Sequence, residues 1–133
     1  MKSLTQAVRY TVAALAFAFA LAAMPTAQAA DENIGLNVAS IPVSTKLTKS
    51  DVEQSLQHCL VARRWLVREK TDGEIVAFYS RGNNVCTLTI RYDAEKIEIF
   101  AVGQARGGGL PMRWIERLKL DITQDLSTRL VTK

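Results

Sequence analysis

The sequence predicts an α+β domain in which two helices pack on one face of a four-stranded antiparallel sheet, in the order α-β-β-β-β-α. Three observations lead to this class. Apolar residues recur at helical spacing near residues 52–60 and again near 115–130. Residues 65–102 between them have the period-two or β-rich character of strands. Short turn-forming segments divide that stretch into four pieces, which is typical of antiparallel neighbours.

The first helix is predicted to begin after Thr48. Thr48 suits the N-cap, with Asp51 three residues on, and Leu47 and Val52 hold the positions of a hydrophobic staple. The pair Arg63-Arg64 suits the C-terminal end, where the helix dipole favours cations. The apolar stripe of this helix is formed by Val52, Leu56, Cys59 and Leu60.

The four strands are predicted at residues 65–70, 74–81, 85–92 and 96–102, joined by turns at 71–73, 82–84 and 93–95. In the third strand, Leu88 and Ile90 share a face with Cys86, and the threonines and Arg91 lie on the opposite face. The face that carries the larger apolar residues is expected to receive the helices.

The second helix follows a glycine-rich connector, residues 103–109, which we interpret as flexible. Pro111 suits the first turn of that helix. Its apolar stripe consists of Ile115, Leu118, Ile122, Leu126 and Leu130, with Trp114 alongside.

Residues 1–29 have the composition of a cleavable export signal. Lys2 and Arg9 are their only charges, and residues 12–24 are an unbroken apolar stretch. Pro25 ends that stretch, and the Ala-Gln-Ala at 27–29 is the small-x-small pattern that signal peptidase reads. As a helix the stretch covers about 20 Å, less than the ~30 Å hydrocarbon core of a bilayer. We therefore expect a periplasmic or secreted protein with no stable membrane span after cleavage.

The mature chain is then an arm, residues 30–47, and a single domain, residues 48–133. Isolated apolar residues in the arm predict an extended segment whose alternate side chains touch something apolar. Whether the arm covers the outer face of the sheet, away from the helices, stays open.

The full chain has 17 basic and 13 acidic residues, and two of the basic ones lie in the leader. The small remaining positive balance excludes a strongly cationic nucleic-acid binder.

Export also gives a meaning to the two cysteines, Cys59 and Cys86. In an oxidising compartment, an even and small number of cysteines is first interpreted as disulfide pairing. One lies on the apolar stripe of the first helix and the other on the strand face that packs against it. A Cys59–Cys86 disulfide is therefore expected, with two buried free thiols as the alternative.

Several short motifs, taken in order and spacing, resemble a family of small exported bacterial proteins and lipoproteins that lack an assigned biochemical function. The resemblance covers residues 48–126 and implies an envelope location and this fold, and it supplies no catalytic residue. The chain departs from the family in having no lipid-attachment cysteine and in residues 104–110, which replace a polar, aromatic-bearing segment. The motifs are Arg64-Trp65, Gly73-Glu74-Ile75-Val76-Ala77, Leu88-Thr89-Ile90-Arg91-Tyr92-Asp93, Arg113-Trp114-Ile115, Leu118 and Asp121-Ile122.

No catalytic, metal or cofactor constellation is visible in the sequence. His58 is the single histidine, and adjacent residues of a helix diverge by about 100°, so His58 and Cys59 do not face each other. The glycines of the connector lack the Lys-Ser/Thr pair of a Walker motif. Trp65 and Trp114 are interpreted as core or core-edge residues rather than a carbohydrate platform. These observations favour a protein that is not an enzyme and needs no cofactor.

Two function classes remain from the sequence. The first is a non-catalytic protein-binding module of the cell envelope, which contacts another protein or a second copy through the outer sheet face. Its candidate surface consists of Leu66, Val76, Phe78, Phe100 and Val102. The alternative is a small enzyme or small-ligand carrier with its site at the 103–113 connector, where the candidate residues are Arg106, Gly107, Gly108, Gly109 and Arg113.

Overall fold

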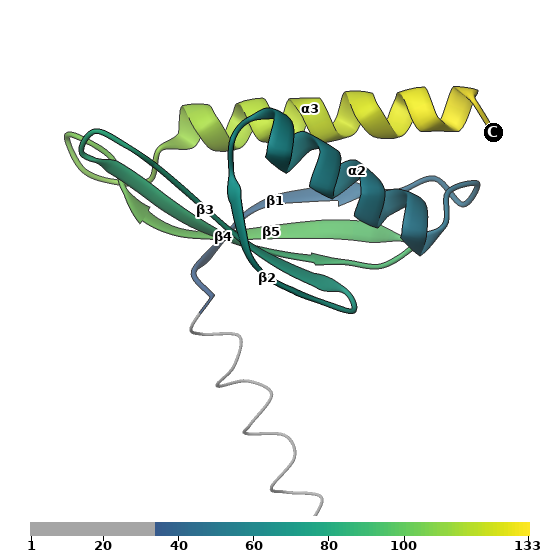
Figure 1. Cartoon of the computed structure of the whole chain (residues 1–133), viewed down its shortest axis with the longest axis horizontal. Helices are drawn as coiled ribbons and strands as arrows, with labels where there is room; N and C mark the ends of the chain where they lie inside the picture. Colours follow the sequence, from purple (N-terminus) through teal and green to yellow (C-terminus); the bar gives the residue numbers. More distant parts are fainter. Residues whose placement is uncertain (1–33) are drawn as a thin grey trace, which may run out of the picture. The chain divides into compact units, whose positions relative to one another are not determined.

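The computed structural model describes residues 34–133. The predicted leader and the first residues of the arm lie outside this part of the chain. The described residues form the elements β1 (Leu36–Pro42), α2 (Lys49–Ala62), β2 (Leu66–Thr71), β3 (Glu74–Arg81), β4 (Asn84–Tyr92), β5 (Lys96–Gln104) and α3 (Met112–Val131). Both helices lie on the same side of one antiparallel sheet (Figure 1), which confirms the α+β class.

The sheet has five strands in the order β1-β5-β4-β3-β2, so the prediction of four strands was wrong. The arm supplies the fifth strand. Its β1 pairs antiparallel with β5, with Ile41 opposite Ile97. Ala39 and Ile41 are buried with the rest of the core. Residues 36–42 therefore extend the sheet sideways at the β5 edge and do not fold over its outer face.

The first helix begins where the sequence predicts. The Thr48 hydroxyl accepts a hydrogen bond from the Asp51 amide (3.1 Å), and the Asp51 carboxylate accepts one from the Thr48 amide (2.8 Å). This reciprocal pair satisfies two amides that have no partner inside the helix. A hydrogen bond from Lys133 is the largest cause that lowers the pKa of Asp51, to about 2. The start of α2 is thereby tied to the end of α3.

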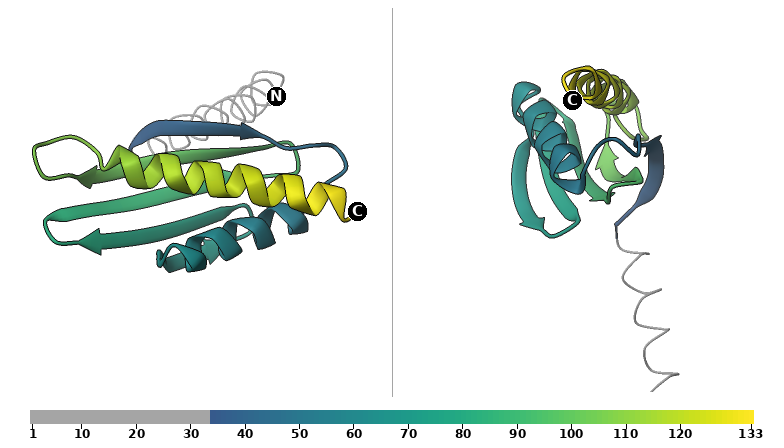
Figure 2. Two further views of the ribbon diagram at one scale, coloured as in Figure 1. Left: turned by 90° about the horizontal axis from the view of Figure 1, so that it is seen from above. Right: turned by 90° about the vertical axis from the view of Figure 1, so that its right-hand side faces the viewer.

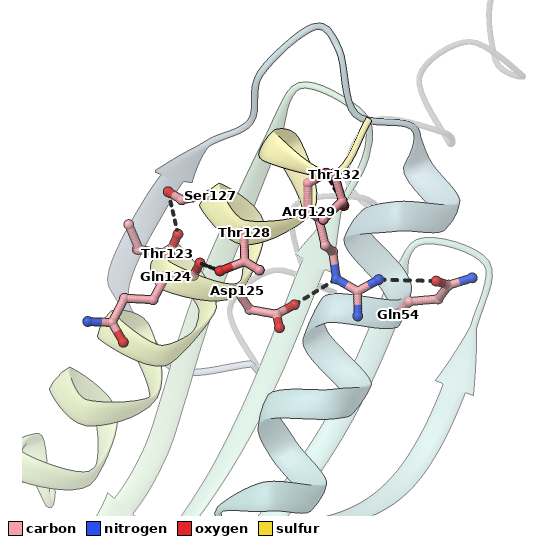
Figure 3. Close-up of polar contacts among 8 residues, drawn as sticks. All are labelled: Gln54, Thr123, Gln124, Asp125, Ser127, Thr128, Arg129 and Thr132. Atoms are coloured by element: carbon pink, nitrogen blue, oxygen red, sulfur yellow. Dashed lines mark hydrogen bonds and ion pairs between the residues drawn. The ribbon is translucent and has the colours of Figure 1, made fainter.

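The two helices run antiparallel, as their contacts show. Lys133 pairs with Asp51 at one end and Arg63 pairs with Asp121 at the other. Between them, the Arg129 guanidinium donates to Asp125 (2.7 Å) within α3 and to Gln54 (3.2 Å) across to α2 (Figure 3). The hydroxyls on the outer side of this part of α3 donate to backbone carbonyls of the preceding turn, for instance Thr128 to Gln124 (3.0 Å).

Gly103 belongs to β5 and is not part of a flexible connector. A Cβ atom at this position would lie 2.3 Å from the Val85 carbonyl oxygen, so close approach to β4 requires glycine here. The remaining connector is an ordered turn, in which the Ala105 amide donates to the Gly109 carbonyl (2.8 Å). Gly107, Gly108 and Gly109 have φ values of 93°, 98° and 75°, which favour glycine.

The predicted disulfide is not present, because Cys59 and Cys86 are both buried free thiols. The reason is the different rise of a helix and a strand. The Tyr92 hydroxyl donates to Glu53 (2.7 Å) and so aligns β4 with α2. Cys59 lies six residues from Glu53 along the helix, a rise of about 9 Å. Cys86 lies six residues from Tyr92 along the strand, a rise of about 20 Å. For a helix and a strand that run side by side, the difference between these two rises is about 11 Å, which exceeds the ~7 Å limit on the Cα separation of bonded cysteines.

We predict that both thiols are slow to react in the folded protein. Burial raises the pKa of each thiol to about 11, and each side chain is at most 3% exposed. Titration with a thiol reagent at neutral pH should give little reaction in native buffer and two equivalents in denaturant without reductant. If no thiol is titrated in denaturant, Cys59 and Cys86 form a disulfide and the free-thiol assignment is wrong.

We also predict that Ile41→Ala lowers the free energy of unfolding by about 3 kcal/mol, because it removes a buried side chain from β1. Ser40→Ala, at the exposed neighbouring position, is the matched control and should change it by less than about 0.5 kcal/mol. Urea unfolding followed by circular dichroism measures both. Equal effects of the two variants would show that β1 is not an integral strand.

Candidate functional site

The two helices differ in length, and this difference opens a site on the inner face of the sheet. The 14 residues of α2 span about 21 Å and the 20 residues of α3 about 30 Å. Because Arg63 at the end of α2 pairs with Asp121, residues 112–120 of α3 continue past α2. The β3–β4 turn and the connector lie at this same end (Figure 2). Within residues 34–133, no second helix lies beside α3 there.

Three aromatic side chains occupy this uncovered region. Tyr79 of β3 lies between two tryptophans: its ring is 4.6 Å from that of Trp114, edge to face, and 5.5 Å from that of Trp65. Trp65 is only 5% exposed and belongs to the core, whereas Tyr79 and Trp114 are half-buried. The rings therefore form a rigid wall of which one side meets solvent.

A cavity of about 320 Å³ opens against this aromatic wall. Its lining comes from the end of α2, from β3 and from the part of α3 that passes α2. Four of its residues are arginines and three are aromatic, and none of the lining residues is acidic. The volume lies at the lower end of the range for ligand cavities. The cavity is lined by Ala62, Arg63, Arg64, Trp65, Tyr79, Arg81, Trp114 and Arg117.

The arginines of this cavity differ in whether their charge is already paired. The hydrogen bond and ion pair with Arg63 hold the pKa of Asp121 below its usual value, so Arg63 is neutralised within the chain. The guanidinium groups of Arg64 and Arg81 are exposed and make no hydrogen bond or ion pair with other residues of 34–133. Arg117 is likewise exposed, and its electrostatic contact is with Asp121. Cationic groups are thus available to an external anion.

Arg64 has an unusual backbone conformation. The amide of Trp65 donates to the Leu60 carbonyl (2.8 Å) and that of Arg64 to the Val61 carbonyl (3.0 Å). These two bonds are the Schellman motif that ends α2, and its left-handed position normally holds glycine. Arg64 occupies it with φ 65°, at a cost of about 1 kcal/mol relative to glycine. The side chain is therefore held at the cavity despite a local backbone strain.

The residues of the predicted connector site are only partly brought together. Arg106 lines a neighbouring cavity with Arg81 and Trp114. Gly107, Gly108 and Gly109 line neither of these two cavities, and the Gly108 amide already donates to the Ala105 carbonyl (2.9 Å). Arg113 is exposed and also outside both linings.

The outer-face residues do lie together. Leu66 is opposite Phe78 and Val76 is opposite Thr89, which in turn is opposite Phe100. Ile75 and Ala77 are fully buried on the other face, as the alternation predicts. Leu66 and Val102 are 60% and 50% exposed, but the two phenylalanines are half-buried, with the guanidinium of Arg68 3.9 Å above Phe78 and that of Arg91 5.7 Å from Phe100.

His58 and Cys59, the pair considered from the sequence, differ in their exposure. His58 is exposed while the adjacent Cys59 is buried, and burial raises the pKa of that thiol. Within residues 34–133, no group of three or more His, Cys, Asp or Glu side chains is placed to hold a metal ion. No helix in that same range is long and apolar enough to cross a membrane.

Comparison with protein-family models, with curated protein sequences and with solved structures finds no match for this chain.

We predict that Arg64→Gly stabilises the protein by about 0.5–1 kcal/mol, because glycine adopts the left-handed position without strain. Arg64→Ala is the matched control, since it removes the same charge and keeps the strained backbone, and it should not stabilise. Urea unfolding distinguishes them. Equal stability of the two variants would show that Arg64 is not strained.

Proposed function

We propose that this protein is a small, non-catalytic binding protein of the cell envelope, and that its arginine–aromatic cavity recognises an anionic ligand. The observation that carries the proposal is the cavity lining, in which arginines with no ion pair or side-chain hydrogen bond inside residues 34–133 lie together with packed aromatic rings. Guanidinium groups bind carboxylate and phosphate oxygens in a fixed planar geometry. The envelope location rests on the leader-like composition of residues 1–29.

The position of Arg64 supports the same conclusion. A strained residue persists where another requirement outweighs its cost. Since the Arg64 guanidinium has no partner within residues 34–133, the fold gains no contact from it to offset that cost. An external anion supplies such a contact.

We favour the cavity over the outer sheet face for this role. On the outer face, Arg68 and Arg91 already cover the two phenylalanine rings, and Arg91 is also paired with Glu74 (3.0 Å). Its arginines are therefore used within the chain. The cavity, by contrast, is lined by Arg64 and Arg81, which make no side-chain hydrogen bond or ion pair within residues 34–133.

The two tryptophans make the proposal directly measurable, because the chain has only two and both line the cavity. We predict that inorganic phosphate or citrate changes the tryptophan emission of the protein in a saturable way, and that neutral glucose does not. The double variant Arg81→Gln/Arg117→Gln should weaken this binding about tenfold or more, because charge-assisted hydrogen bonds are lost. Added salt should weaken it further.

The matched control is Arg68→Gln, which removes an exposed arginine from the outer face and should leave anion binding unchanged. The proposal fails if no anion changes the emission, or if the Arg68 variant weakens binding as much as the cavity double variant.

A further inference from the structure

A second cavity adjoins the first and shares a wall with it. It has a volume of about 440 Å³ and lies between the β3–β4 turn, the connector and α3. Arg81 and Trp114 line both cavities. The two cavities are therefore neighbours that meet at these two residues. The second cavity is lined by Arg81, Gly82, Asn83, Asn84, Arg106 and Trp114.

The second cavity is built in a similar way to the first. Arg106 is exposed, and its side chain has no ion pair with any residue of 34–133. Its amide donates to the Asn84 side chain (2.6 Å), which fixes the connector against the start of β4. The lining again contains no acidic residue. A second anionic group thus has a cation and neutral amides to contact there.

The charges follow one another from the end of α2 to the connector. Arg64 and Arg117 belong to the first cavity, Arg81 to both, and Arg106 to the second. A single small anion reaches one of these cavities. An extended peptide places every second side chain on one side, about 7 Å apart, and so presents successive carboxylates to successive arginines.

We infer that the ligand of this site is an acidic segment of another polypeptide, bound in an extended conformation across both cavities with Trp114 beneath it. This inference rests on the proposed function, since it uses the same arginine–aromatic cavity. Tryptophan, tyrosine and arginine are the residues that dominate the binding energy of protein interfaces. Recognition of acidic segments by clustered arginines is an established mode of peptide binding.

The packing of the rings distinguishes a peptide from a single-stranded nucleic acid. Nucleic-acid sites present aromatic faces on which successive bases stack. Here Trp65 is only 5% exposed and Tyr79 lies edge to face against Trp114. The rings pack on one another and form a continuous wall. They do not offer a row of separate exposed faces on which bases could stack.

Three probes test the inference on the purified protein by tryptophan emission. They are inorganic phosphate, a blocked peptide of about nine residues in which aspartate alternates with serine, and oligothymidylate of similar length. The peptide should bind at least about tenfold more tightly than phosphate, because it engages both cavities. A peptide with lysine in place of aspartate should not bind.

Arg106→Ala is the decisive variant, because Arg106 lines only the second cavity. It should weaken peptide binding about fivefold and leave phosphate binding unchanged. Arg64→Gly should weaken the binding of both probes. If circular dichroism shows that Arg106→Ala disturbs the fold, Arg106→Lys, which keeps the charge, serves as the second variant and should retain most peptide affinity.

The outcomes separate the two proposals. If phosphate binds but the peptide binds no better, or if Arg106→Ala has no effect on the peptide, the extended acidic ligand is wrong and the anion-binding function stands. Tighter binding of oligothymidylate than of the peptide also overturns the acidic peptide. If no anionic probe binds, the proposed function itself is wrong.

Discussion

The unequal length of the two helices is the constraint on which the site depends. The strands β3, β4 and β5 have eight or nine residues and offer more inner surface than a 14-residue helix can cover. The longer α3 covers the part of the sheet beneath it along its whole length. The neighbouring part of the sheet is covered only as far as α2 extends. Exposed apolar sheet surface is costly in water. Trp65, Tyr79 and Trp114 cover it instead, and large flat rings leave a hollow where a helix would have left none.

The pairing of α2 with α3 fixes where that hollow lies. The contacts of Lys133 with Asp51 and of Arg63 with Asp121 align the helices. A shift of α2 by one turn, about 5 Å, would close much of the hollow or expose more of the sheet. Arg63 therefore belongs to the scaffold, while its neighbour Arg64 remains available. Two adjacent arginines of the same sequence have different roles because one has a carboxylate within reach and the other does not.

The sequence was sufficient for the elements that obey a local period. Both helices, the four strands of the meander and the capping box at Thr48 follow from spacing alone. The arm was predicted to be extended, but its pairing with β5 was missed. That pairing joins positions about 60 residues apart, and a bulge between Asn37 and Ala39 interrupts the alternation. The disulfide was wrongly predicted because sharing a packed interface does not place two residues at the same height along it.

The candidate site was visible in the sequence only in fragments. Arg63 and Arg64 were interpreted as helix-end cations, and Trp65 and Trp114 as core residues at the starts of elements. Arg81 and Arg117 had no signal at all, because the contact between positions so distant in the chain is set by tertiary packing. The unusual feature of Arg64, a non-glycine residue in the left-handed position of a helix end, gave no signal in the sequence either. Its recognition requires the backbone angle, which the sequence does not contain.

The pairing of β1 with β5 also has a consequence for the order in which the chain acquires its structure. The strands β2 to β5 are joined by short turns, so their contacts are local and form quickly. The partner of β1 lies about 60 residues further along the chain, so this pairing forms later. Until β5 has formed, β1 has no strand to pair with, and until β1 docks, the edge of β5 is open. Because β1 precedes the other strands in the chain, the sheet is completed last by the strand that is synthesised first.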